Sequence, residues 1–80
     1  MRVKLNGPLR MGAGGAAEVE IEAATIRELL ERLVERFPAM QGDLDRGIAV
    51  AIDDTIYRDD WTQTIPDGAE VVLLPRIEGG

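Results

Sequence analysis

The chain has 80 residues, a formal net charge of −6, no histidine and no cysteine. This length predicts one small domain with a modest core. Without thiolates or imidazoles the chain lacks the usual ligands of zinc, iron and copper, and the usual nucleophile and general base of a catalytic centre. The negative charge disfavours nucleic acid, and no segment has the roughly 20 apolar residues of a membrane helix. We therefore expect a cytoplasmic protein that binds no metal or cofactor and whose partners are proteins.

Two strands are predicted near the start of the chain. Residues 1–5 and 18–22 alternate apolar with charged side chains, a period-two pattern typical of strands with one buried face. Gly7-Pro8 breaks the first strand, and the glycine-rich segment 12–17 is typical of a loop. We expect residues 1–6 and 17–22 to pair as a hairpin.

One amphipathic helix is predicted next. Apolar residues recur at helical spacing from Ile26 to Phe37, and Thr25 to Glu28 fits a capping box. Pro38 should end the helix, because its ring disfavours helical geometry at the residue before it. The segment from there to residue 47, rich in Gly and Asp, is expected to be a loop.

Three further strands are expected, over residues 48–52, 55–57 and 70–74. The order β-β-α-β-β-β predicts an α+β roll, a mixed sheet with the helix packed on one face. The first and last strands can lie parallel at its centre, because a long crossover joins them.

Three other features have ordinary structural explanations. Gly12 to Gly15 is not followed by the Lys-Ser or Lys-Thr pair of a phosphate-binding loop. The pairs Asp53-Asp54 and Asp59-Asp60 lack the spacing of a calcium loop and are expected in turns and caps. Trp61 is either a partner anchor or a cover for the small core.

The end of the chain has a distinctive pattern. Asp67-Gly68-Ala69-Glu70-Val71 is followed by three strand residues, Pro75, and then Arg76-Ile77-Glu78-Gly79-Gly80. With the element order, this resembles the ubiquitin-like β-grasp sulfur carriers of the MoaD/ThiS family, closest to the small subunit of molybdopterin synthase. Ala69, Arg76 and Glu78 depart from the family pattern, which has Asp, Pro and a small residue there.

The resemblance implies a β-grasp domain over residues 1–75 and a flexible tail over 76–80. An E1-like adenylating enzyme would activate the Gly80 carboxylate with ATP and magnesium, and sulfur transfer would leave a thiocarboxylate. The acceptor would be the large subunit of molybdopterin synthase, in molybdenum cofactor biosynthesis, and it would supply the catalytic residues. The tail would enter a partner's channel. Its residues are Pro75, Arg76, Ile77, Glu78 and Gly79, and the glycines, which have no Cβ, allow close approach.

Three alternatives remain open from the sequence. A ubiquitin-like modifier would use the same activated Gly80 to acylate lysines of target proteins. A sulfur carrier could also serve another pathway, such as thiamine, cysteine or tRNA thiolation. A β-grasp interaction module with an incidental Gly-Gly would keep its function when the last two residues are removed.

The last strand also predicts a docking surface. By resemblance to ubiquitin-like folds, Val71 and Leu73 should point into the core and Val72 and Leu74 away from it. Ala49 and Ala51 should lie beside them on the outer face. An exposed apolar patch of this kind typically marks a protein partner site, so these four residues are the predicted partner-binding surface.

Overall fold

The computed structural model describes residues 1–58 and 60–75. Its strands are β1 (Arg2–Leu5), β2 (Glu18–Glu20), β3 (Ile48–Ile52), β4 (Thr55–Tyr57) and β5 (Val71–Pro75). Its helices are α1 (Leu9–Gly12), α2 (Ile26–Arg36) and α3 (Gln41–Arg46), with a short 3-10 helix, η1 (Pro38–Met40), before α3. In this part of the chain no helix has the length and apolar character needed to cross a membrane.

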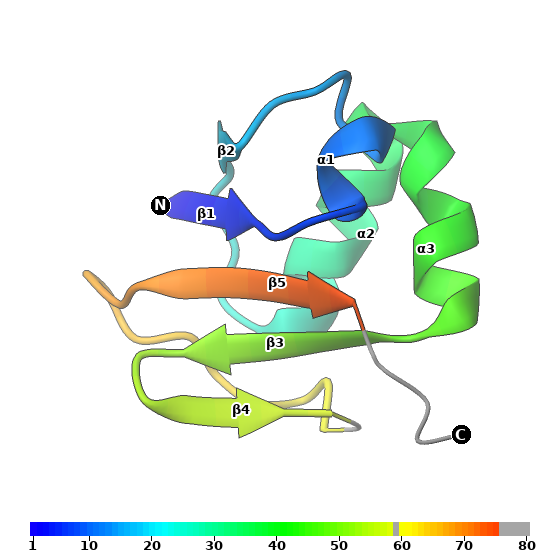
Figure 1. The fold of residues 1–80 in the computed structure, drawn as a ribbon. Coiled ribbons are helices and arrows are strands. Elements are labelled where there is room, and N and C mark those ends of the chain that lie inside the picture. The colour runs from blue at the N-terminus through cyan, green and yellow to red at the C-terminus, as the bar shows by residue number, and fades with distance from the viewer. Residues whose placement is uncertain (59, 76–80) are drawn as a thin grey trace.

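The five strands form one mixed sheet in the order β2-β1-β5-β3-β4 (Figure 1). β1 pairs antiparallel with β2, and Val3 lies opposite Val19, which confirms the predicted hairpin. β5 is central, parallel to β1 and antiparallel to β3. The α+β architecture and the parallel pairing of first and last strands are therefore as the sequence predicts.

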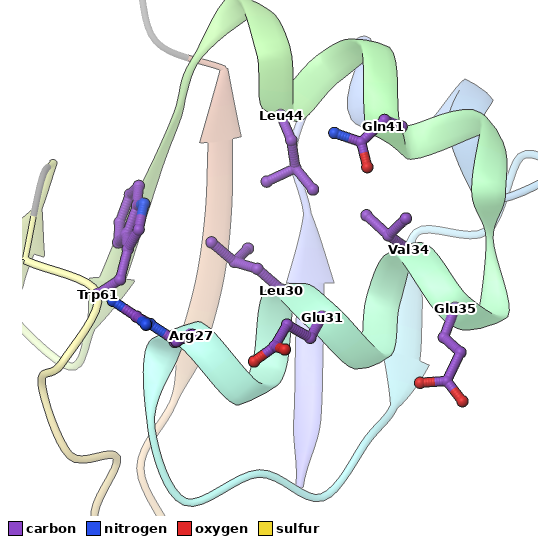
Figure 2. A pocket seen from close by; sticks show the side chains of 8 residues that line it. All are labelled: Arg27, Leu30, Glu31, Val34, Glu35, Gln41, Leu44 and Trp61. Carbon is purple, nitrogen blue, oxygen red and sulfur yellow. The ribbon is translucent and has the colours of Figure 1, made fainter.

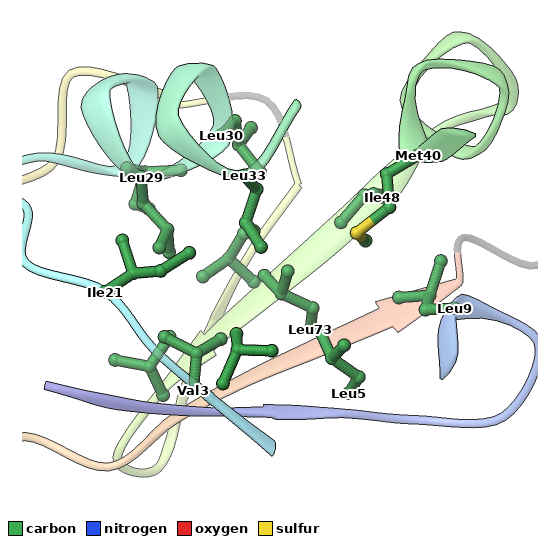
Figure 3. Close-up of a cluster of buried hydrophobic side chains, with 14 of the residues drawn as sticks. Val3, Leu5, Leu9, Ile21, Leu29, Leu30, Leu33, Met40, Ile48 and Leu73 are labelled. Atoms are coloured by element: carbon green, nitrogen blue, oxygen red, sulfur yellow. The ribbon is translucent and has the colours of Figure 1, made fainter. Parts of the chain in front are cut away.

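The core lies between the sheet and α2. Val3 and Leu5 of β1 and Leu29 and Leu33 of α2 are at most 1% exposed, and Figure 3 shows these side chains converging between the two layers. Alternation along the strands supplies one layer of this core and the helical stripe supplies the other. Figure 3 also shows α3 on the same side of the sheet as α2, so that among the described residues no helix lies over the opposite face.

α2 begins with the predicted cap in a modified form. The Thr25 hydroxyl accepts from the Glu28 backbone N–H at 3.2 Å. The Glu28 carboxylate reaches one residue further back than in a standard capping box and accepts from the N–H of Ala24 at 2.9 Å. The helix ends at Arg36, and Pro38 opens η1, so the predicted stop is confirmed.

Two segments predicted as loops contain short helices. α1 includes Gly12, so the predicted loop over 12–17 begins one residue later, and η1 and α3 occupy the segment before residue 47. Leu9 and Met40 are each 1% exposed, and burial of these two side chains holds the short helices against the core. The last strand spans Val71–Pro75 instead of residues 70–74, and the predicted strand over 18–22 ends at Glu20.

Candidate functional site

The outer face of the sheet carries an apolar patch along β5. Val71 and Leu73 are fully buried, whereas Val72 and Leu74 are half-buried on the opposite side, as the predicted register requires. β3 places Ala51 beside Val72 and Ala49 beside Leu74. Because alanine is short, the two β5 side chains stand above their neighbours on this face. The structure thus brings together the four residues predicted for partner binding.

Ile56 extends this surface and was missed by the sequence reasoning. It lies opposite Ala51 in the β3–β4 pair, and it is 48% exposed, one of two large apolar side chains classed as exposed among the described residues. Since paired residues of neighbouring strands share a face, Ile56 belongs to the same surface as Ala51 and Val72. A pairing of residues 48–52 with 55–57 across the Asp53-Asp54 turn could have revealed it. We call the set Val72, Leu74, Ala49, Ala51 and Ile56 the outer-face patch.

Charged side chains cover the other half of the same face. Arg2 of β1 lies 3.5 Å from Glu18 and 3.8 Å from Glu20, both on β2. Lys4 lies beside Val72 in the β1–β5 pair and is 3.7 Å from Glu70. The outer-face patch therefore has a charged border along β1, and exposed ion pairs of this kind contribute little to stability.

The α-amine of Met1 forms ion pairs at the edge of the charged half of the outer face. Its nitrogen lies 2.5 Å from Oε1 of Glu22 and 3.3 Å from Oε2 of Glu20. The hydrogen bond that the Met1 amine donates to Glu22 raises the pKa of the amine above its ordinary value of 8.0, and the same bond lowers the pKa of Glu22 below 4.5. The pair is thus charged across the neutral range.

β5 ends at Pro75, at one end of the sheet, and the terminal segment of the sequence follows it. Pro75 pairs with Ile48, the first residue of β3, and is half-buried. The remaining tail residues, Arg76, Ile77, Glu78, Gly79 and Gly80, lie outside the described residues, as does the predicted flexibility of this segment. Their roles therefore remain predictions.

A pocket lies between α2 and α3 on the helix side of the sheet. Figure 2 shows Leu30, Val34 and Leu44 pointing into the space between the two helices, with Trp61 at one end. Trp61 is half-buried and packs against the core cluster, as the predicted covering role requires. The pocket wall also includes Arg27, Glu31, Glu35 and Gln41.

The glycine segment and the Asp53-Asp54 pair lie in turns, as expected, whereas Asp59 of the other acidic pair lies outside the described residues. Gly14 and Gly15 have φ angles of 69° and 91°, so their segment is a left-handed turn, and the next element is the strand β2 and not a helix. Asp53 caps the turn before β5, because its Oδ1 accepts from the Glu70 N–H at 3.0 Å. Within residues 1–58 and 60–75, no three acidic side chains gather closely enough to hold a metal ion.

Comparison with known families decides the relationship of this chain. A family model described as the ThiS family matches residues 3–80, from Val3 in β1 to the Gly79-Gly80 ending. The chain belongs to the ThiS family. Its mixed sheet with a packed helix is accordingly the ubiquitin-like β-grasp fold of the sulfur carriers.

Solved structures resemble this ThiS-family chain over nearly its whole length. A chain of the BexX/CysO complex from Amycolatopsis orientalis has a TM-score of 0.77 at 25% identity, covering 99% of this chain and 98% of that one. A putative molybdopterin converting factor, subunit 1, from Pyrococcus furiosus has a TM-score of 0.77 at 26% identity, covering 95% of both chains. Small archaeal modifier protein 1 from Haloferax volcanii has a TM-score of 0.74 at 26% identity, covering 99% and 97%. A sequence search among curated proteins gave no match.

Proposed function

We propose that this protein is a sulfur carrier, in which the carboxylate of Gly80 is adenylated and then converted to a thiocarboxylate. The observation that carries the proposal is the ThiS-family match, which extends from Val3 in β1 to Gly79-Gly80. The structure supports it by anchoring β5 in the core through Val71 and Leu73 and ending the strand at Pro75, five residues before the terminus.

The chemistry of a carboxylate explains why a partner enzyme is needed. A carboxylate is a poor acyl donor, and adenylation converts it to a mixed anhydride whose acyl carbon a sulfur nucleophile can attack. The C–O bond to phosphate then breaks, AMP leaves and a C–S bond forms. The chain has no histidine or cysteine to catalyse these steps. An E1-like adenylating enzyme would therefore hold the ATP and magnesium, and this chain would act as its co-substrate.

The outer-face patch supplies the docking surface in this proposal. Val72 and Leu74 would insert into a partner, with Ala49 and Ala51 allowing a close approach of the partner's surface. Pro75 and the tail residues Arg76, Ile77 and Glu78 would then lead Gly79 and Gly80 into the partner's channel. Two residues without a Cβ fit a narrow channel better than any other pair.

For the acceptor we propose molybdopterin synthase, whose large subunit would receive the sulfur for the molybdenum cofactor. The likeness to the Pyrococcus protein named as a molybdopterin converting factor subunit favours this pathway. The equal likeness to the BexX/CysO complex keeps other sulfur-accepting pathways as the alternative. That second structure also favours the general expectation that such a chain works in complex with a partner protein.

A second candidate function is protein modification, in which Gly80 is joined to a lysine amine of a target. The likeness to small archaeal modifier protein 1 favours it. Both functions use the same adenylated terminus. Lysates separate them, because a modifier gives a ladder of heavier conjugates whereas a dedicated carrier runs as a free chain.

Intact-mass measurement tests the primary proposal. With its cognate adenylating enzyme, ATP, magnesium and a sulfur donor, the protein should exchange one oxygen for sulfur, and fragmentation should place the change on Gly80. Reactions without ATP serve as the control. A protein that stays unmodified while the enzyme is active on its own positive control would contradict the assignment.

A further inference from the structure

Amines are scarce in this chain. Of its nine basic side chains, eight are arginines and one is a lysine, Lys4. A guanidinium stays protonated throughout the pH range of proteins and does not attack acyl groups, whereas an ε-amine attacks them once it loses its proton. Besides the Met1 α-amine, Lys4 is therefore the one amine that an activated carboxyl group could acylate.

The structure distinguishes these two amines. The Met1 nitrogen is held by two carboxylates, of Glu22 at 2.5 Å and of Glu20 at 3.3 Å. The Lys4 side chain is 49% exposed, and its ion pair with Glu70 is long, at 3.7 Å. In model peptides an α-amine, with a pKa of about 8, reacts ahead of an ε-amine, with a pKa of about 10.4. Here the hydrogen bond to Glu22 raises the pKa of the Met1 amine, which narrows this difference.

Lys4 also has a particular position on the sheet. It neighbours Val72 in the parallel pairing of β1 with β5, so its side chain borders the outer-face patch. An acyl group on Nζ that carries a whole second domain would therefore lie over or beside Val72.

We propose that Lys4 is an acyl-acceptor site, and that the activated Gly80 of one copy can be joined to Nζ of Lys4 in a second copy. This inference rests on the proposed activation of Gly80. The neutral amine attacks the acyl carbon of the adenylate, a C–N bond forms, the C–O bond to phosphate breaks, AMP leaves and the amine's proton passes to water. No oxidant or reductant is needed, and ATP is the only co-reactant.

The consequence is a link between conjugation and docking. The acceptor copy carries its attached domain beside the patch that a partner would have to cover. A copy linked at Lys4 should therefore be a poor substrate for the adenylating enzyme, although its own Gly80 is free. A copy that has accepted a second copy at Lys4 should therefore be hindered from acting as a sulfur carrier.

A chemically prepared thioester at Gly80 tests the acceptor without any enzyme. Incubated alone at pH 8, the protein should form a dimer whose peptide map shows a Gly80–Lys4 isopeptide bond. K4R should lower dimer formation at least about tenfold, because arginine is not nucleophilic. Linkage through the Met1 amine, or an undiminished yield in K4R, would overturn the proposal.

A control dimer tests the effect on docking. In K4R/R36K the acceptor amine is moved to α2, on the opposite side of the sheet from the patch. The dimer linked at Lys4 should be adenylated on its acceptor copy at least about tenfold more slowly than the dimer linked at position 36, if the patch carries a hot spot for the enzyme. Equal rates would overturn the blocking role. If the enzyme fails to adenylate even the unlinked protein, the proposed function fails, while the thioester reaction still reports on Lys4 by itself.

Discussion

At the scale of single residues, the side chains of β5 fall into two sets, one in the core and one on the outer face of the sheet. Val71 and Leu73 are fully buried and hold the strand in the core, which turns Val72 and Leu74 to the other face of the sheet. Their neighbours on β3 are alanines, so no long side chain stands beside them on that strand, and Lys4 of β1 borders Val72 on the other side. Apolar side chains placed in this way cost the fold little when changed but can contribute strongly to an interface.

Val72→Asp should separate docking from folding. We expect affinity for the adenylating enzyme to fall by about 1–2 kcal/mol or more, because a carboxylate would be buried in an apolar contact. The free energy of unfolding should change by only about 0.5 kcal/mol, as is usual for a solvent-face substitution. Calorimetric titration and denaturant unfolding measure the two quantities. Ile56→Asp should behave similarly if the patch extends to β4.

Thr55→Asp is the matched control for charge. Thr55 is exposed and lies opposite Ile52, so it is on the strand that carries Ile56 but not on the outer-face patch. It should leave the affinity unchanged. Equal affinity of the Val72→Asp protein and the wild type would remove the docking role, and an unfolded Val72→Asp protein would mean that the side chain is needed in the core.

The pair formed by Met1 and Glu22 predicts a bell-shaped pH effect. Glu22, whose pKa is lowered, stabilises the fold above 4.5 and loses this contribution as the pH falls through its folded pKa. The Met1 amine, whose pKa is raised, contributes below 8.0 and loses this as the pH rises through its folded pKa. Glu22→Gln should therefore lower Tm most between these two values, by a small amount because Glu22 is exposed.

Glu18→Gln is the control for this pH profile. Glu18 pairs with Arg2, and arginine keeps its charge throughout this range. The effect of Glu18→Gln should therefore show no loss on the alkaline side. An effect of Glu22→Gln that persists unchanged above about pH 10 would contradict the role of the α-amine.

At the scale of elements, alanine substitutions at two glycines in short helices should have opposite effects on stability. A Cβ on Gly12 of α1 would lie 2.7 Å from Cγ of Met40, a fully buried side chain of η1. Gly12→Ala should therefore destabilise the protein by about 1–3 kcal/mol through overpacking. On Gly42 of α3, a Cβ would lie 3.7 Å from the Arg46 guanidinium, so Gly42→Ala should stabilise by about 0.5–1 kcal/mol through helix propensity. Urea unfolding measures both, and a Gly12→Ala protein at least as stable as the wild type would contradict the close contact between α1 and η1.

The same elements explain which parts of the fold the sequence could predict. α2 is predictable from two local signals in the sequence, the apolar stripe that becomes buried and the Thr25 cap. α1 has one buried residue, Leu9, and α3 has none, with Leu44 half-buried. Their helical form depends on packing against residues distant in sequence, which periodicity does not report.

At the scale of the whole molecule, the resemblance to ubiquitin-like folds predicted which side chains of β5 meet the core, and alternation placed the charged side chains of β1 and β2 on the outer face. Ile56 escaped prediction because its exposure depends on its cross-strand partner, Ala51, and on the edge position of β4. The tail functions rest on sequence alone, since residues 76–80 lie beyond the described part of the chain. In the proposed function the domain supplies the docking surface and Gly80 undergoes the sulfur chemistry.

The most direct test of the central claim is the rate of sulfur incorporation into the intact protein compared with a variant lacking Gly80. Deletion moves the acyl group back by as much as about 3.6 Å, the reach of one extended residue. Since misplacement by about 1 Å can cost on the order of a hundredfold in rate, the variant should be thiocarboxylated at least about a hundred times more slowly. Both proteins keep the outer-face patch, so their affinity for the adenylating enzyme should remain similar. Equal rates of thiocarboxylate formation in the two proteins would contradict the assignment of Gly80 as the sulfur-carrying residue.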